Sequence, residues 1–217
     1  MADRRLALPL LYVILDAALL PSDPVEFVKR SMEAGAHLFQ YRNKTAPARG
    51  VLQAAQALSI TARQEGASFL VNDRPDLAWL AWANGVHVGQ DDLEVAAARK
   101  IVGEQAIIGV STHNLQQFSK ATEADCDYIA LGPIFATRSK ANPDQVVGLE
   151  LIREARKLTN KPIVAIGGIT LERTADVIRA GADSIAVISD ILTAKNPVAR
   201  VKQYLEILSP PAQPAQN

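Results

Sequence analysis

Polar side chains follow the short apolar runs of this sequence, and several carry groups suited to binding anions or a metal ion. In "QYRNK", Gln40, Arg42 and Lys44 alternate, so in an extended chain all three face the same side. Other polar residues follow the later runs: Asn72 and Asp73, Asp91 and Asp92, Ser111 and His113, Thr137 to Lys140, and Ser189 and Asp190. The opposite ends of the runs, such as "GAH" and "GAS", carry few functional groups. This asymmetry predicts a polar site at one end of a sheet, as in an enzyme.

Asp73 and Asp92 are candidate metal ligands, because carboxylate oxygens suit a hard cation such as Mg²⁺. The alternative is helix capping, since each residue stands just before a helix-like segment and Asp is a favoured N-cap. The bases Arg42, Lys44 and Lys140 favour the metal interpretation. Carboxylates and bases together match a Mg²⁺-bridged diphosphate, in which the metal takes phosphate oxygens and the bases neutralise the remaining charge.

Short apolar runs alternate with helix-like segments along most of the chain. In "PVEFVKRSMEAGA", Pro24 is placed for a helix start and Gly35 for its end. The apolar runs have four to six residues each, the length of a strand: Leu10–Leu15, His37–Tyr41, Ser68–Asn72, Gly85–Val88, Ile107–Val110, Tyr128–Leu131, Pro162–Ile166 and Ser184–Ile188. Eight such units in 217 residues predict an α/β protein, a single-domain (β/α)8 TIM barrel. An open doubly wound sheet is the alternative, which the absence of a G-x-G-x-x-G motif disfavours.

A second anion site is expected at the glycine pair of "IGGIT". Loops after the seventh and eighth strands of such barrels frequently bind phosphate through backbone N–H groups. Gly167 and Gly168 allow close backbone approach, and Ser189 adds a hydroxyl. The alternative is that the glycine pair serves only a tight turn.

The composition is that of an ordinary globular protein without a strong overall field. Lys plus Arg and Asp plus Glu each number 23, so we expect no nucleic-acid or membrane partner. The single cysteine, Cys126, excludes an intrachain disulfide and fits a reducing cytoplasm. "RRLALPLLYVIL" resembles the start of a signal peptide, but Asp16 interrupts the run, and we interpret it as a buried strand. We expect residues 1–208 to form the barrel and the Pro- and Gln-rich residues 209–217 to form a disordered tail.

Some residues are expected to be structural. His87 lies within an apolar run and is expected in the core or a second layer, whereas His113 is near the rim. Trp79 and Trp82 are expected to pack between helices rather than to stack on a ligand. The segment from Pro133 to Gly148 is longer than the usual connection in such folds, so we expect a lid that excludes water.

Several motifs together resemble the thiamine phosphate synthase family. They are "QYRNK", "VNDRPDLA", "GVHVGQDDL", "IGVSTHN", "DYIALGPIFATRSK", "PIVAIGGIT" and "GADSIAVIS", and they extend from about Tyr12 to Ile191. The resemblance implies a (β/α)8 transferase that joins a hydroxymethylpyrimidine diphosphate to a thiazole phosphate and releases diphosphate, with Mg²⁺ required. A related thiazole tautomerase shares the barrel and the "IGG" region but generally lacks the full set of glutamine, paired carboxylates and loop lysine. A metal-independent isomerase and a non-catalytic phosphate-binding barrel remain the alternatives to test.

The resemblance also implies a role for each matching residue. Those that meet the pyrimidine diphosphate are Gln40, Arg42, Lys44, Asn72, Ser111 and Lys140, of which Arg42, Lys44, Ser111 and Lys140 carry the catalysis. Asp73 and Asp92 are the implied metal ligands. Those that hold the thiazole phosphate are Thr137, Ser139, Gly168, Ile188 and Ser189. Ser139 replaces the second Thr of the family's Thr-x-Thr-Lys loop, and because it keeps the hydroxyl we expect tuned rather than lost binding.

Overall fold

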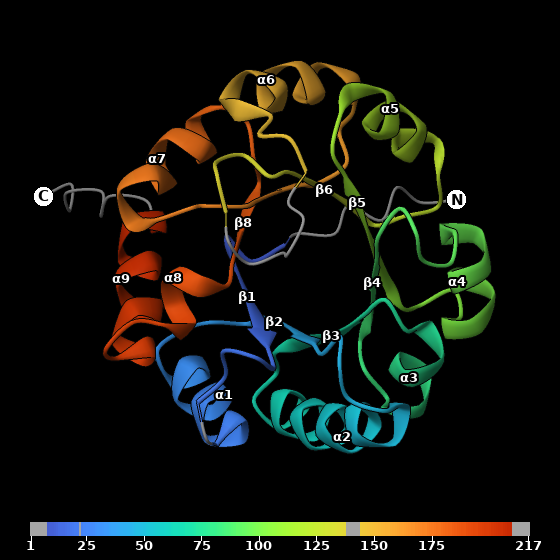
Figure 1. Cartoon of the computed structure of the whole chain (residues 1–217), viewed down its shortest axis with the longest axis vertical. Coiled ribbons are helices and arrows are strands. Elements are labelled where there is room, and N and C mark those ends of the chain that lie inside the picture. Colours follow the sequence, from blue (N-terminus) through green and yellow to red (C-terminus); the bar gives the residue numbers. More distant parts are fainter. Residues whose placement is uncertain (1–7, 22, 138–143, 210–217) are drawn as a thin grey trace, which may run out of the picture.

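Eight parallel strands close into a barrel in the order in which they occur along the chain (Figure 1). The computed structural model describes residues 8–21, 23–137 and 144–209. The strands are β1 (Leu11–Asp16), β2 (Leu38–Arg42), β3 (Ser68–Asn72), β4 (Gly85–Val88), β5 (Ile107–Thr112), β6 (Tyr128–Leu131), β7 (Ile163–Ile166) and β8 (Ser184–Val187). Since β8 pairs with β1, the sheet has no free edge.

Helices form a ring around the outside of the barrel (Figure 1). They are α1 (Pro24–Glu33), α2 (Ala48–Gln64), α3 (Pro75–Leu80), α4 (Val95–Val102), α5 (Leu115–Glu123), α6 (Gly148–Leu158), α7 (Leu171–Arg179), α8 (Ser189–Leu192) and α9 (Pro197–Leu208). The predicted single-domain (β/α)8 barrel is therefore confirmed, and the open doubly wound alternative is excluded by the closed strand order. No helix within the described ranges is long and apolar enough to cross a bilayer.

Successive residues of each strand serve two different cores. Leu11, Val13 and Leu15 of β1 belong to the large apolar layer between the barrel and the helices. Tyr12 and Ile14 of the same strand point into the barrel, where they join a smaller cluster. This alternation explains why β1 is buried along its whole length, as the sequence predicts for "LYVILD".

Local sequence signals set the boundaries of several helices. The Asp23 carboxylate accepts a hydrogen bond of 3.0 Å from the Glu26 N–H, and Pro24 occupies the first turn of α1. Just after the helix, Gly35 adopts a φ of +104°, which favours glycine. Both ends of α1 therefore lie where Pro24 and Gly35 predict them.

Several strand ends differ from prediction by one or two residues. β1 continues to Asp16, and β5 continues to Thr112, so Ser111 lies inside a strand rather than after it. β8 ends at Val187, because Ile188 turns out of the sheet to begin α8. These shifts matter for the site, because a residue held in a strand has a more fixed side-chain direction than one in a loop.

The expectation that Trp79 and Trp82 pack between helices is wrong. Their relative exposures are 61% and 65%, because Leu77 and Ala78 occupy the buried side of the short helix α3. Trp82 lies just past the helix with a φ of +51°. The expected disordered tail falls almost wholly on residues 210–217, which lie outside the described residues.

Candidate active site

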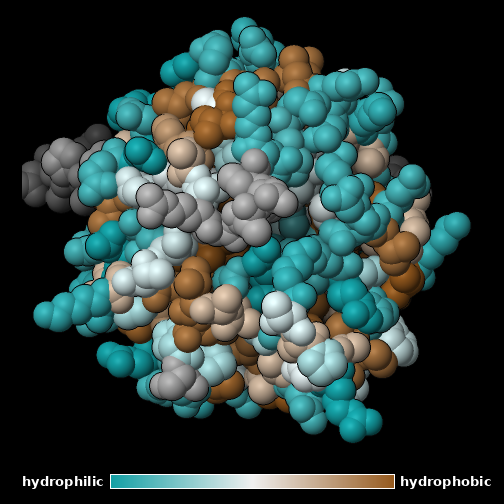
Figure 2. All heavy atoms as spheres, viewed as in Figure 1, coloured by the Kyte–Doolittle hydropathy of each residue, from teal (hydrophilic) through white to brown (hydrophobic). Residues whose placement is uncertain are grey.

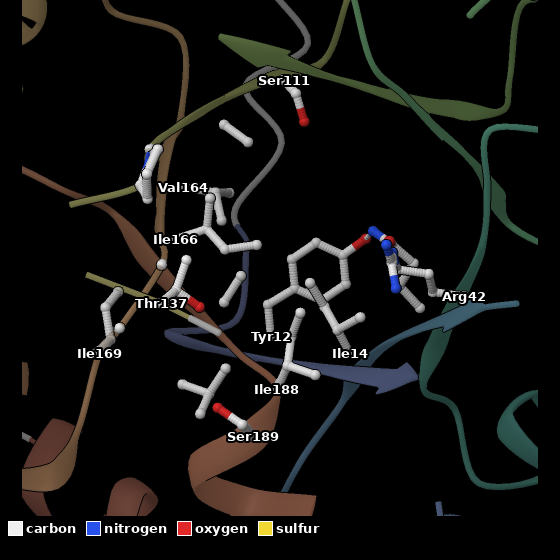
Figure 3. Close-up of a pocket in the computed structure, with 18 of the residues that line it drawn as sticks. Tyr12, Ile14, Arg42, Ser111, Thr137, Val164, Ile166, Ile169, Ile188 and Ser189 are labelled. Atoms are coloured by element: carbon white, nitrogen blue, oxygen red, sulfur yellow. Dashed lines mark hydrogen bonds between the residues drawn. The ribbon is translucent and has the colours of Figure 1, made fainter. Parts of the chain in front are cut away.

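A pocket opens at the carboxyl ends of the strands, and all eight strands contribute to its wall. Eight of the residues predicted for the site line this one cavity: Gln40, Arg42, Asn72, Ser111, Thr137, Gly168, Ile188 and Ser189. Figure 3 shows Arg42 on one side of the pocket and Thr137 on the other, with Tyr12 and Ile14 between them. The face drawn in Figure 2 is covered mainly by hydrophilic residues, as expected for a rim open to solvent.

Arg42 is fixed in the pocket wall by a carboxylate that sequence reasoning missed. Its Nη1 donates to Oδ2 of Asp16, the residue paired with it in the β1–β2 register. Oδ1 of Asp16 accepts a second hydrogen bond, of 3.0 Å, from the Ala18 N–H. Asp16 is buried, so it holds the guanidinium in one orientation while leaving donors for an anion.

Lys44 lies beyond the end of β2, outside the pocket lining, and forms an ion pair with Asp73. Asp73 in turn lies beside Asp92, and the pKa of Asp73 is raised by burial and by that second carboxylate, while Lys44 opposes the rise. Asp92 also accepts a hydrogen bond of 2.7 Å from the Gly89 N–H, which fixes its direction. The neighbouring Asp91 is exposed, so Asp92 is the inward carboxylate, as the sequence resemblance implies.

The capping alternative for these carboxylates is wrong. The N-cap of α3 is Arg74 and that of α4 is Glu94, and neither helix start has a side-chain cap hydrogen bond. Asp73 instead has a φ of +62°, an uncommon conformation that Asp tolerates better than most residues with a side chain. Both carboxylates are therefore placed for a purpose other than capping.

Asp73 and Asp92 fit a divalent cation. Two neighbouring carboxylates repel each other when both are ionised, and a cation between them relieves that repulsion. Among the described residues no cluster of three or more His, Cys, Asp or Glu side chains forms a complete metal site. Bound there, a divalent cation would take two oxygen donors from the chain and would need further oxygens to complete its coordination.

The glycine pair after β7 has a clear steric requirement. Gly167 and Gly168 adopt φ values of +100° and +62°. A Cβ on Gly167 would lie 2.5 Å from the Cβ of Pro133, and one on Gly168 would lie 2.4 Å from the carbonyl oxygen of Ala136. The pair therefore serves a tight turn against the β6–α6 connection, and the same turn forms part of the pocket wall.

Cationic and hydroxyl groups surround that turn. Arg173 of α7 donates to the Gly168 carbonyl oxygen at 2.8 Å, and its guanidinium lies 4.5 Å from the ring centre of Phe135. Thr137 and Ser189 line the same part of the cavity. Asp190, the next residue, is held by Arg200 Nη1 at 2.8 Å and by the Tyr204 hydroxyl at 2.7 Å.

The sequence comparisons agree with this geometry. A protein-family model described as thiamine monophosphate synthase matches residues 11–191 of the chain. The chain belongs to this family. The thiamine-phosphate synthase of Koribacter versatilis is 50% identical over 94% of this chain and 97% of its own length. That of Chloroflexus aurantiacus is 42% identical over 92% of each chain.

A solved structure supports the same assignment. The thiamine phosphate pyrophosphorylase from Pyrococcus furiosus superposes with a TM-score of 0.83 at 34% identity, covering 91% of this chain and 94% of that one. The resemblance found in the sequence motifs is thereby confirmed. This member of the thiamine monophosphate synthase family is an enzyme, a transferase of thiamine biosynthesis.

The remaining predicted residues have different outcomes in this family member. Lys44, Asp73 and Asp92 gather at the mouth of the barrel rather than in the pocket lining. Ser139 and Lys140 lie outside the described residues, as does the middle of the expected lid. The two described ends of that segment are joined, since the Val147 N–H donates to the Pro133 carbonyl oxygen at 2.9 Å.

Both pocket histidines are held by neighbours. Nδ1 of His113 lies 2.6 Å from the Gly132 carbonyl oxygen, which only accepts, so this nitrogen carries the proton. His87 is buried, as predicted, and both its ring nitrogens are hydrogen-bonded. Sequence reasoning missed Tyr12, Asp16 and Arg173, because their roles depend on strand register and on contacts between distant segments.

Proposed function

We propose that this enzyme joins hydroxymethylpyrimidine diphosphate to a thiazole phosphate, forming thiamine phosphate and releasing diphosphate. The observation that carries the proposal is the presence of two polar regions at one cavity. One contains Arg42 with the neighbouring Lys44, Asp73 and Asp92, and the other contains the Gly168 turn. Two phosphorylated substrates need two such regions, whereas an isomerase of a single phosphate needs one.

The first step breaks the bond between the pyrimidine methylene carbon and the diphosphate oxygen, and the electron pair leaves with diphosphate. Arg42, oriented by Asp16, neutralises part of the charge that develops on the leaving group. Lys44 adds a second positive charge from the rim, and Lys140, which lies outside the described residues, would add a third. Mg²⁺ bound at Asp73 and Asp92 would neutralise diphosphate oxygens and so improve the leaving group.

The second step forms the new carbon–nitrogen bond. An amino-substituted pyrimidine delocalises the positive charge left at its methylene carbon, and the thiazole nitrogen then supplies an electron pair. No strong general base is required, which agrees with the hydrogen bonds already made by both nitrogens of His87 and by Nδ1 of His113. The main contributions of the protein are positioning and electrostatic stabilisation.

The thiazole phosphate is assigned to the side of the pocket formed by Gly168, Thr137, Ile188 and Ser189. This assignment is supported by the glycine turn and by Arg173 beside it, which adds positive charge. The proposal includes no nucleic-acid or membrane partner. We further propose a cytoplasmic location, which is supported by the single, buried and unpaired Cys126.

Chelation distinguishes this proposal from its rivals. Purified protein is incubated with both substrates, with Mg²⁺ or with excess EDTA, and thiamine phosphate is quantified. We expect product with Mg²⁺, none with EDTA, and recovery when Mg²⁺ is restored. A metal-independent isomerase would convert a single phosphorylated substrate equally well in EDTA. A binding-only barrel would retain both ligands, measured by calorimetry, without making product, and either result would overturn the proposal.

A further inference from the structure

A chain of hydrogen bonds runs through the barrel interior along the floor of the pocket. It joins side chains from β2, β1, β6, β4 and β5, in the order Gln40, Tyr12, Tyr128, His87 and Ser111. The distances are 2.8 Å from Gln40 Nε2 to the Tyr12 hydroxyl, 3.0 Å between the tyrosine hydroxyls, and 2.8 Å from Tyr128 to His87 Nδ1. The last link, from His87 Nε2 to Ser111 Oγ, is 2.8 Å. All of these residues except Tyr128 line the pocket.

The strands make room for this chain. A Cβ on Gly109 would lie 2.0 Å from Cζ of Tyr128, so the glycine in "IIGVS" opens the space that the Tyr128 ring fills. That ring lies edge-on to Tyr12, with centroids 6.0 Å apart, and stacks on His87 at 5.6 Å. Barrel interiors of this fold are usually filled by branched apolar side chains, so a continuous polar chain here is a specific feature.

The hydrogen bonds from Gln40 to Ser111 all run in one direction, from donor to acceptor. The Gln40 amide N–H donates to the Tyr12 oxygen, so the hydroxyl proton of Tyr12 must find another acceptor. Tyr128 is the acceptor available to it within the described part of the chain. The Tyr128 proton is then directed to His87 Nδ1. The opposite direction would leave a buried Tyr12 hydroxyl proton without an acceptor, at a substantial cost.

The direction fixes the state of the last two residues. With Nδ1 accepting, the neutral His87 ring carries its proton on Nε2 and donates it to Ser111 Oγ. The Ser111 hydroxyl proton is then left to point toward a ligand. Burial raises the pKa of both Tyr12 and Tyr128 above the ordinary tyrosine value, so both phenols stay protonated and can pass the hydrogen bond along.

We propose that Tyr128 and His87 are positioning residues that hold the Ser111 hydroxyl as a hydrogen-bond donor toward the bound heterocycle. The ligand atom facing Ser111 is therefore an acceptor, such as an aromatic ring nitrogen, and not an amino group. Only the identity of that heterocycle as the pyrimidine rests on the proposed function. The direction of these hydrogen bonds depends on the protein alone and not on its substrate.

The tautomer of His87 tests the direction without any substrate. The full-length protein is labelled with ¹⁵N-histidine, and the His87 signals are assigned by their loss in His87→Gln. In the wild type we expect an unprotonated Nδ1 and a protonated Nε2, which differ strongly in nitrogen chemical shift. A protonated Nδ1 with an unprotonated Nε2 would reverse the chain and overturn the proposal, whether or not the protein makes thiamine phosphate.

Kinetics test the positioning role. Tyr128 does not line the pocket, so Tyr128→Phe acts on the site only through its neighbours. We expect the KM for the pyrimidine diphosphate to rise about tenfold, the effect of about 1.4 kcal/mol, with the KM for the thiazole phosphate unchanged. The control is Thr112→Val. Thr112 follows Ser111 in β5, and its buried hydroxyl donates to the Ala130 carbonyl oxygen, so this variant removes a buried hydroxyl that is not part of the hydrogen-bonded chain. A folded Tyr128→Phe protein with wild-type KM values would contradict the role.

If Tyr128→Phe does not fold, two variants at His87 test the same positioning role. His87→Gln keeps an N–H group that reaches toward Ser111, whereas His87→Leu keeps only volume. We expect the KM for the pyrimidine diphosphate to be raised much less in the glutamine variant than in the leucine variant. Equal KM values in the two variants would show that His87 only fills space.

Discussion

The ammonium of Lys44 and the carboxylate of Asp73 form an ion pair at the mouth of the barrel, beside Asp92. In this pair, a lysine suited to binding phosphate and a carboxylate suited to binding a metal neutralise each other. Lys44 is half-exposed, so the pair contributes little stability and opens readily. A metal ion at Asp73 would displace Lys44 and leave its ammonium for the diphosphate.

Replacing Asp92 tests the assignment of the metal ligands. Asp92→Asn removes one of the two negative charges next to each other at the rim, so Mg²⁺ should bind more weakly. We expect the Mg²⁺ concentration for half-maximal activity to rise tenfold or more. Asp91→Asn is the matched control, because Asp91 is exposed, and its Mg²⁺ dependence should equal that of the wild type. An Asp92→Asn enzyme with unaltered Mg²⁺ dependence would refute the ligand assignment.

The raised pKa of Asp73 predicts how metal binding depends on pH. Burial is the main cause of the rise, so the carboxyl keeps its proton at a higher pH than an ordinary aspartate does. Because Mg²⁺ needs the ionised form, affinity should fall as the pH drops through this raised pKa. Lys44 opposes the rise, so Lys44→Met should raise the pKa further and move the loss of affinity to higher pH.

Calorimetry of Mg²⁺ with inorganic diphosphate, repeated at several pH values, measures this shift. Lys100→Met is the control, since Lys100 is an exposed lysine in the last turn of α4. A Lys44→Met curve that coincides with the control curve would show that the ion pair has no influence on Asp73.

Asp16 is expected to act through Arg42. Asp16→Asn keeps the side-chain size but removes the charge that anchors the guanidinium, so Arg42 should become less ordered. The KM for the pyrimidine diphosphate should rise about tenfold, as expected for loss of one charge-assisted hydrogen bond. Asp176→Asn, which breaks the exposed Arg179 ion pair on α7, should leave the KM unchanged. Equal KM values for the two variants would contradict a role of Asp16 in substrate binding through Arg42.

Alanine substitutions at Gly168 and Gly66 distinguish the cost of backbone strain from the cost of steric contact with the neighbouring loop. Gly168→Ala should lower stability both by a left-handed φ, costing roughly 1–2 kcal/mol, and by contact with Ala136 and Phe135. Gly66→Ala has a similar φ of +71° with nothing within 4 Å of the new Cβ, so it should carry the strain alone. Thermal unfolding should show the larger loss for Gly168→Ala, and only this variant should raise the KM for the thiazole phosphate. Equal losses would mean that the turn has no steric role.

Most of the fold could be predicted from the sequence because each strand carries its own signal. Runs such as Ser68–Asn72 and Gly85–Val88 match the observed strands at both ends. The alternation of Gln40 and Arg42 correctly places both in the pocket. The spacing alone could not show that Lys44, two residues further, leaves the strand and turns to Asp73.

What the sequence did not reveal depends on partners brought together by the barrel. The link between Tyr12 and Tyr128 joins residues 116 positions apart and requires both the strand register and the space left by Gly109. The exposure of Trp79 and Trp82 depends on which side of the short α3 faces the barrel. Such features follow from tertiary packing, which overrides local pattern.

The most direct measurement is the stoichiometry of the reaction. Purified protein is supplied with Mg²⁺ and both substrates, or with each substrate alone, and thiamine phosphate and diphosphate are quantified together. We expect equal amounts of the two products when both substrates are present, and no thiamine phosphate when either is omitted. The absence of thiamine phosphate from the complete reaction, with folded protein that binds both ligands, would contradict the proposed function.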